Sequence, residues 1–142
     1  MVVSHNHLLH RTFLVPAIAI VIGMLTSLAA VAQVPEIPVR GMRGMASVQI
    51  ERNGQQTIRY NPRTCAEMGP DLCAFFRTHE YGHVALNHLR NGTPTRQAEY
   101  EADRWAARNA SPAAVAAAIN FFGQGSGGSL RHGSARSRAE RV

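Results

Sequence analysis

Residues 75–88 read FFRTHEYGHVALNH, with three histidines and one glutamate in a mostly apolar segment. Within it, His79, Glu80 and His83 are spaced as H-E-x-x-H. Four residues advance an α-helix by about 400°, so the two imidazoles project from nearly the same side, one turn apart. That separation suits two nitrogen ligands of one zinc ion. Glu80 is rotated by about 100° from His79, so its carboxylate is expected to hydrogen-bond a metal-bound water.

His88 is the third histidine of this stretch, and we do not expect it to bind the metal. On a continuous helix it would point about 140° away from His83. We expect it instead at the end of the helix, where an imidazolium would suit the negative end of the helix dipole. Because a catalytic zinc ion takes three protein ligands and leaves one position open, the third ligand must come from elsewhere.

The segment QAEYEADRWAA on the next predicted helix offers that ligand. Glu99 and Asp103 are again four residues apart, and a turn at residues 91–94 would fold this helix back antiparallel to the first. Glu99 would then complete a His₂Glu set, and Asp103 would accept the outer N–H of a ligand histidine. Glu101 lies on the opposite face and is expected to face solvent. A less specific interpretation stays open, in which the histidines are surface residues and the two acids form an exposed face that pairs with arginines.

The surrounding elements are predicted from hydrophobic patterns and turn residues. ASVQI and QTIRY, residues 46–50 and 56–60, alternate in hydrophobicity and flank Asn53-Gly54, which favours a β-hairpin with a type I′ turn. Capping and stop residues predict three helices, over residues 72–90, 94–109 and 113–122. The fold is therefore predicted to be α+β, with an N-terminal hairpin followed by three helices.

Residues 1–32 are predicted to be a signal peptide. An uncharged run at residues 12–32 ends in Ala-Val-Ala, a small-x-small cleavage pattern. If it is not cleaved, the same run could span a bilayer and associate the protein with the membrane as an anchor. In both cases the domain is exported, and we expect it to be periplasmic, secreted or anchored to the membrane.

Cys65 and Cys73 are the two cysteines of the chain. In an oxidising compartment they are expected to form a disulfide, which would stabilise the fold by about 2–3 kcal/mol by restricting the unfolded chain. The alternative is two reduced, buried thiols.

The chain carries 15 basic residues, all arginine, against 9 acidic residues, for a net charge of +6. Half of the excess lies in residues 123–142, a segment rich in glycine, serine and arginine that favours a solvated terminus. We therefore predict no nucleic-acid partner.

HEYGHVALNH followed by AEYEADRWAA resembles the gluzincin metallopeptidases of the HtpX and CAAX-prenyl-protease type, whose pattern is H-E-x-x-H and then E-x-x-A-D. The resemblance covers about residues 71–110. It implies a small zincin-like domain with one zinc ion on His79, His83 and Glu99, and Glu80 as the catalytic acid/base. Such proteins often carry a later His-Pro-x-x-x-x-Arg segment. Here glycine replaces the proline, so His132 and Arg138 either stabilise the oxyanion or are residues of the tail.

Proline, glycine and serine content divides the exported chain into an extended lead-in at residues 33–45, a central domain at 46–122 and the C-terminal segment at 123–142. The resemblance implies that the central part is a minimal metallopeptidase domain. The expected activity is zinc-dependent hydrolysis of a peptide or an unfolded protein. The hairpin could pair with an extended peptide or cover the helices. One alternative is a zinc-binding envelope module or chaperone-like protein with little or no hydrolysis. Another, a small basic membrane-associated protein, leaves the paired motifs unexplained.

Overall fold

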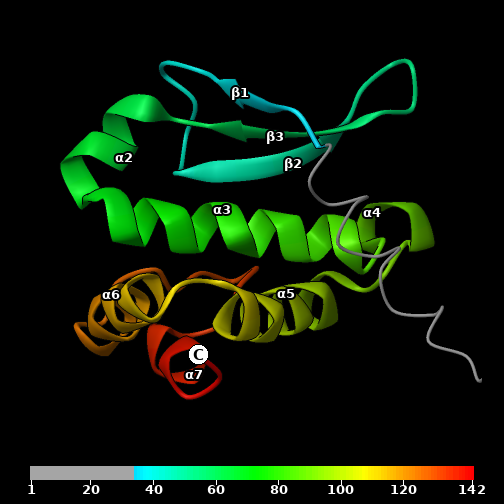
Figure 1. Cartoon of the computed structure of the whole chain (residues 1–142). Coiled ribbons are helices and arrows are strands. Elements are labelled where there is room, and N and C mark those ends of the chain that lie inside the picture. Colours follow the sequence, from blue (N-terminus) through cyan, green and yellow to red (C-terminus); the bar gives the residue numbers. More distant parts are fainter. Residues whose placement is uncertain (1–33) are drawn as a thin grey trace, which may run out of the picture.

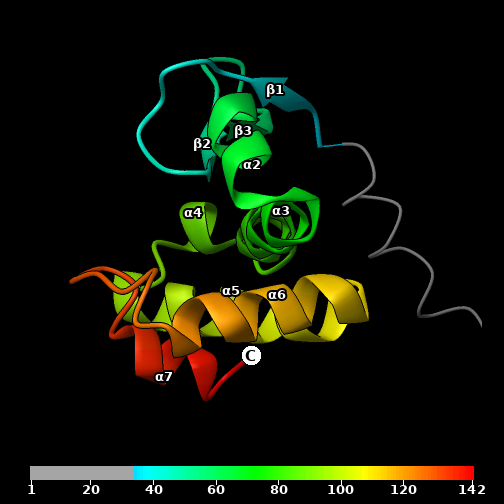
Figure 2. The same ribbon diagram turned by 90° about the vertical axis from the view of Figure 1, so that its left-hand side faces the viewer.

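Helix α3 (Pro70–Ala85) lies at the centre of the fold and carries the H-E-x-x-H sequence. The computed structural model describes residues 34–142, so the predicted signal peptide or anchor lies outside the described residues. In Figure 1, α3 separates a three-stranded sheet from a layer formed by α5 (Thr95–Asn109) and α6 (Pro112–Gly123). Figure 2 views α3 end on and shows the same order of layers. The predicted α+β class is confirmed.

The sheet has the strand order β1-β3-β2. Strands β2 (Ala46–Ile50) and β3 (Gln56–Tyr60) form the predicted antiparallel hairpin, with Val48 opposite Ile58. Strand β1 (Glu36–Pro38) pairs in parallel with β3 and was predicted only as an extended lead-in. Three residues carry too little hydrophobic pattern to reveal a pairing partner that lies some twenty residues away in the sequence.

The hairpin turn is not the predicted type I′. That turn needs positive φ at both central residues, whereas here Gly54 (φ +79°) is the one turn residue with positive φ. The Gly54 N–H donates to the Glu51 carbonyl over 2.8 Å, and the Asn53 side chain accepts the Gln55 N–H over 3.0 Å. This is a bulged turn, in which the asparagine acts through its side chain and does not adopt the left-handed conformation.

Residues 34–142 contain six helices, of which three had been predicted. The additional helix α2 (Pro62–Met68) starts at a proline, and the Asn61 side chain accepts the N–H groups of Arg63 and Thr64 at its N-terminus. Cys65 of α2 and Cys73 of α3 form the predicted disulfide, with 5.0 Å between their Cα atoms. The bond fits an oxidising compartment.

The helix predicted to reach residue 90 ends at Ala85. Asn87 adopts the left-handed conformation (φ 55°), and a separate short helix, α4 (His88–Asn91), follows it. Asparagine tolerates this conformation better than most side chains, so Asn87 is the sequence signal for the break. The break redirects His88 toward the interior.

Residues 123–142 fold back onto the helices, against the expectation of a solvated terminus. Ser129 and Gly133 form a β-bridge, and helix α7 (Ala135–Ala139) follows. Arg138 of α7 is only 2% exposed, because its guanidinium pairs with a buried carboxylate. Within residues 34–142, every helix is too short or too polar to cross a membrane.

The core lies between α3 and α6. Phe75 and Phe122 are almost fully buried and meet edge to face, with 6.0 Å between ring centroids. Ala114 and Ala118 of α6 are fully buried, and such small side chains allow close packing of helices.

Helices α3 and α5 also approach each other closely, at Gly82. A Cβ atom on Gly82 would lie 3.2 Å from Ala102 and from Trp105. Gly82→Val should therefore force the two helices apart and lower the free energy of unfolding by about 1–3 kcal/mol. Gly123→Val is the matched control, because a Cβ there meets nothing within 4 Å. Urea denaturation followed by circular dichroism measures both, and equal stabilities would contradict the close approach.

Candidate metal centre

Helices α3 and α5 bring together His79, His83 and Glu99. Glu99 Oε2 lies 3.1 Å from His79 Nε2 and 3.6 Å from His83 Nε2, and the two imidazole nitrogens are 3.2 Å apart. Ligands bound to a tetrahedral zinc ion at 2.0–2.1 Å lie about 3.3–3.4 Å from one another. These side chains are at most 3% exposed. The three atoms therefore have the spacing that one metal ion requires.

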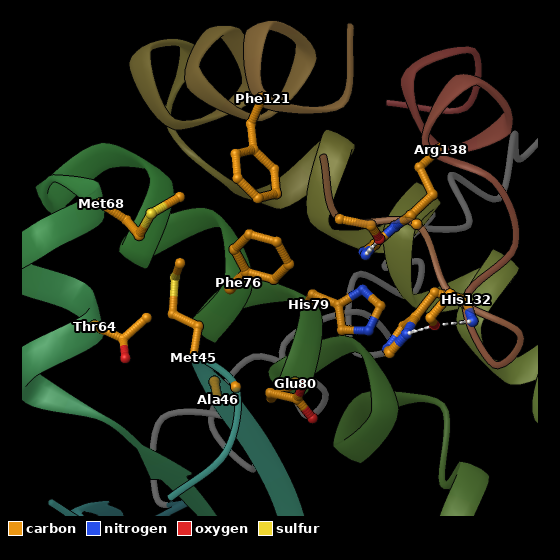
Figure 3. A pocket seen from close by; sticks show the side chains of 14 residues that line it. Met45, Ala46, Thr64, Met68, Phe76, His79, Glu80, Phe121, His132 and Arg138 are labelled. Carbon is orange, nitrogen blue, oxygen red and sulfur yellow. Dashed lines mark hydrogen bonds between the residues drawn. The ribbon is translucent and has the colours of Figure 1, made fainter. Parts of the chain in front are cut away.

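His132 brings a further donor atom to this cluster from the loop before α7. Its Nε2 lies 3.1 Å from Glu99 Oε2, and the donor atoms of His79, Glu99 and His132 all lie within 4.8 Å of one another. Figure 3 shows the His132 ring beside that of His79. The cluster of histidines and glutamate could thus hold a metal ion, with His132 either as a ligand or as a neighbour of the open position.

Asp103 orients His79 by binding the ring nitrogen that faces away from the cluster. His79 Nδ1 lies 2.8 Å from Asp103 Oδ1, so the ring donates its outer N–H to the carboxylate and directs Nε2 toward the cluster. Arg138 donates two hydrogen bonds to Asp103, over 2.6 and 2.9 Å, and Arg141 a third over 2.7 Å. Arg138 therefore reaches the site, but Asp103 engages its guanidinium.

Burial and hydrogen bonds set the protonation states of the cluster. Burial raises the pKa of Glu99, but hydrogen bonds from His79 and His83 outweigh it and hold that pKa far below its usual range. Burial lowers the pKa of His79, yet its bonds to Asp103 and Glu99 raise it to about 9. Burial lowers the pKa of His132 to about 4. Near neutral pH, Glu99 is therefore anionic and His132 neutral, and a metal would displace the proton from His79.

Glu80 lies outside the donor cluster, between α3 and the outer strand β2. Its Oε2 accepts the Val48 N–H over 2.9 Å, and the residue is 9% exposed. Glu80 and His79 line the same cavity, where Figure 3 shows the carboxylate below the imidazole. A carboxylate so placed can reach a water in the cavity without binding the metal itself.

His88 is buried, contrary to the expected charged position at a helix end. It is 4% exposed, and burial lowers its pKa. Its Nδ1 lies 2.9 Å from His83 Nδ1 and its Nε2 lies 2.9 Å from Oε2 of Glu101, the residue expected to face solvent. One set of tautomers satisfies both contacts: His83 donates to His88, and His88 donates to the carboxylate. This relay leaves His83 Nε2 as the unprotonated nitrogen that a metal requires.

Comparison with protein families, curated proteins and solved structures finds no match to this chain. The chemistry of the centre is therefore inferred from its residues and their geometry. Two imidazoles and a buried carboxylate form a donor set that suits a divalent transition metal.

Glu99→Ala should abolish binding of one equivalent of metal, because it removes the single carboxylate of the donor set. Glu67→Ala, in a side chain that is 57% exposed, is the matched control and should bind normally. Equilibrium dialysis followed by elemental analysis measures the stoichiometry. Binding of one equivalent by both variants would contradict the assigned donor set.

His88→Leu should weaken metal binding about 10- to 100-fold, the usual effect of losing a residue that orients a ligand. His88→Gln should restore much of the affinity, because its amide can accept from His83 and donate to Glu101. Competition with a chromophoric chelator gives the affinities. If the leucine variant stays folded and binds like the wild type, the relay does not support the metal.

Proposed function

We propose that the protein is a zinc-dependent metalloendopeptidase that acts outside the cytoplasm, with a zincin-like fold of the gluzincin type. The observation that carries the proposal is the position of Glu80, which lines the cavity beside His79 without joining the donor cluster. His79, His83 and Glu99 would hold the ion. Glu80 also accepts the Val48 N–H, but a purely structural zinc site needs no acid or base beside its ligands.

Zinc is the metal that the donor set supports best. Calcium and magnesium take six or more ligands, mostly oxygen, whereas this cluster offers imidazole nitrogens and one carboxylate oxygen. Zinc is commonly held by two histidines and one glutamate in catalytic sites. When bound, it would supply a water of lowered pKa and a Lewis acid for the substrate carbonyl.

The residues of the chain then divide the hydrolysis between them. Glu80 takes a proton from the attacking water while the oxygen of that water bonds to the carbonyl carbon of the peptide. Glu80 then passes the proton to the amine as the carbon–nitrogen bond breaks. His132, which borders Glu99 and the cavity, would donate to the oxygen that becomes negative. The guanidinium of Arg138 is already bound to Asp103, which in turn binds His79. Arg138 would therefore act indirectly, by holding Asp103 and His79 in position.

Location outside the cytoplasm rests on two features. The disulfide between Cys65 and Cys73 fits an oxidising compartment. The signal peptide at residues 1–32 remains a prediction, and so does membrane association through residues 12–32.

A zinc-binding envelope module with little or no hydrolysis is the second candidate. It is favoured by His132, because a fourth protein ligand would close the coordination sphere, as in structural zinc sites. The two candidates differ in one measurable property, which is proteolysis that a chelator abolishes and zinc restores.

Glu80→Gln should retain one zinc and lose at least about 100-fold of the activity, because general acid–base catalysis is removed while the ligands remain. The side-chain amide oxygen of the introduced glutamine can still accept the Val48 N–H, so the variant should keep its fold. Release of peptides from denatured casein measures activity, with Glu67→Gln as the matched control. Undiminished proteolysis by Glu80→Gln would refute the mechanism. Zinc-loaded wild type without proteolysis would favour the binding module.

A further inference from the structure

A cavity of about 440 Å³ opens directly beside His79 and Glu80. Figure 3 shows that its far wall is mostly apolar, with Met45, Met68, Phe76 and Phe121 beside Ala46 and Thr64. A volume of this size lies in the range of sites that bind small ligands or single side chains. The mechanism proposed above uses only the polar end of this cavity.

The apolar wall is assembled from separate parts of the fold. Met45 precedes β2, Met68 ends α2, Phe76 lies on α3 and Phe121 lies on α6. The two rings meet edge to face, with 5.9 Å between their centroids. The disulfide ties α2 to α3 and so holds this side of the cavity in place. Met68 is 39% exposed, which leaves its apolar surface available to an occupant.

The cavity is poorly suited to a charged occupant. Its ionisable lining residues gather at the polar end, where Glu80 accepts from Val48, and Asp103 and the Gly127 carbonyl engage Arg138. A charged side chain in the apolar part would lose its hydration without gaining an ionic partner. Flexible methionine side chains can adapt to apolar groups of different shape.

We propose that this cavity binds a large apolar side chain of the substrate, such as leucine, methionine or phenylalanine, at a residue flanking the cleaved bond. This inference rests on the proposed function and names its substrate class. The side chain would lie between Met68 and the two phenylalanines, and its backbone would then pass His79 and Glu80. Because each buried CH₂ contributes favourably, leucine at this position should be preferred over alanine by about 10- to 100-fold in kcat/KM.

The first experiment maps cleavage sites in denatured casein by mass spectrometry, using the zinc-loaded wild type and Glu80→Gln. We expect leucine, methionine and phenylalanine to be enriched at one position beside the cleaved bonds. Cleavage without such enrichment would overturn the cavity proposal but would still support the proposed peptidase activity. Absence of cleavage by the wild type would overturn both.

The second experiment uses peptides that differ only at that position, carrying leucine, alanine, aspartate or lysine. Met68→Glu places a carboxylate in the apolar wall. The kcat/KM for the leucine peptide should therefore fall at least about 10-fold, and that for the lysine peptide should rise relative to it. Leu130→Glu is the matched control, because Leu130 is 98% exposed and does not line the cavity. Unchanged zinc content shows that both variants fold. Equal preferences in the two variants would overturn the assignment.

Discussion

The buried carboxylate of Asp103 is the group on which the arrangement of three segments depends. It is fully buried and binds His79 of α3, Arg138 of α7 and Arg141 beyond it. A buried carboxylate is strongly destabilising unless charged partners and hydrogen bonds compensate it. Two guanidinium groups and an imidazole provide that compensation here. The contact that stabilises the fold thus also orients a histidine of the candidate centre.

The two histidines of the H-E-x-x-H sequence are supported independently. His79 donates to Asp103, whereas His83 donates to His88, which in turn donates to Glu101. In both rings Nδ1 is occupied and Nε2 points to the same space. A centre built in this way does not rely on the metal alone to choose the orientation of its ligands.

Local spacing predicted the elements and contacts that depend on helical periodicity. H-E-x-x-H and the later E-x-x-x-D placed His79, Glu99 and Asp103 on facing helices. The helix predicted over residues 113–122 is α6, where the Ser111 side chain accepts the Ala114 N–H at the N-terminus. Residues that favour a chain reversal between the two helices were enough to bring these side chains within reach of one another.

Features that depend on long-range pairing could not be predicted in the same way. Strand β1 is defined by its partner β3, and the C-terminal segment is ordered by arginines that reach a carboxylate in α5. Composition alone describes that segment as polar and basic, which is also true of a solvated tail. The left-handed Asn87 carried a local signal, but a continuous helical pattern from α3 concealed it.

The dependence on Arg138 and Arg141 makes the candidate centre sensitive to changes far from the H-E-x-x-H sequence. A chain shortened to end after α6 would keep His79, His83 and Glu99, but Asp103 would lack both of its guanidinium partners. Residues 138–141 are therefore part of the structure that orients the donor atoms, although they follow the H-E-x-x-H sequence by more than fifty residues.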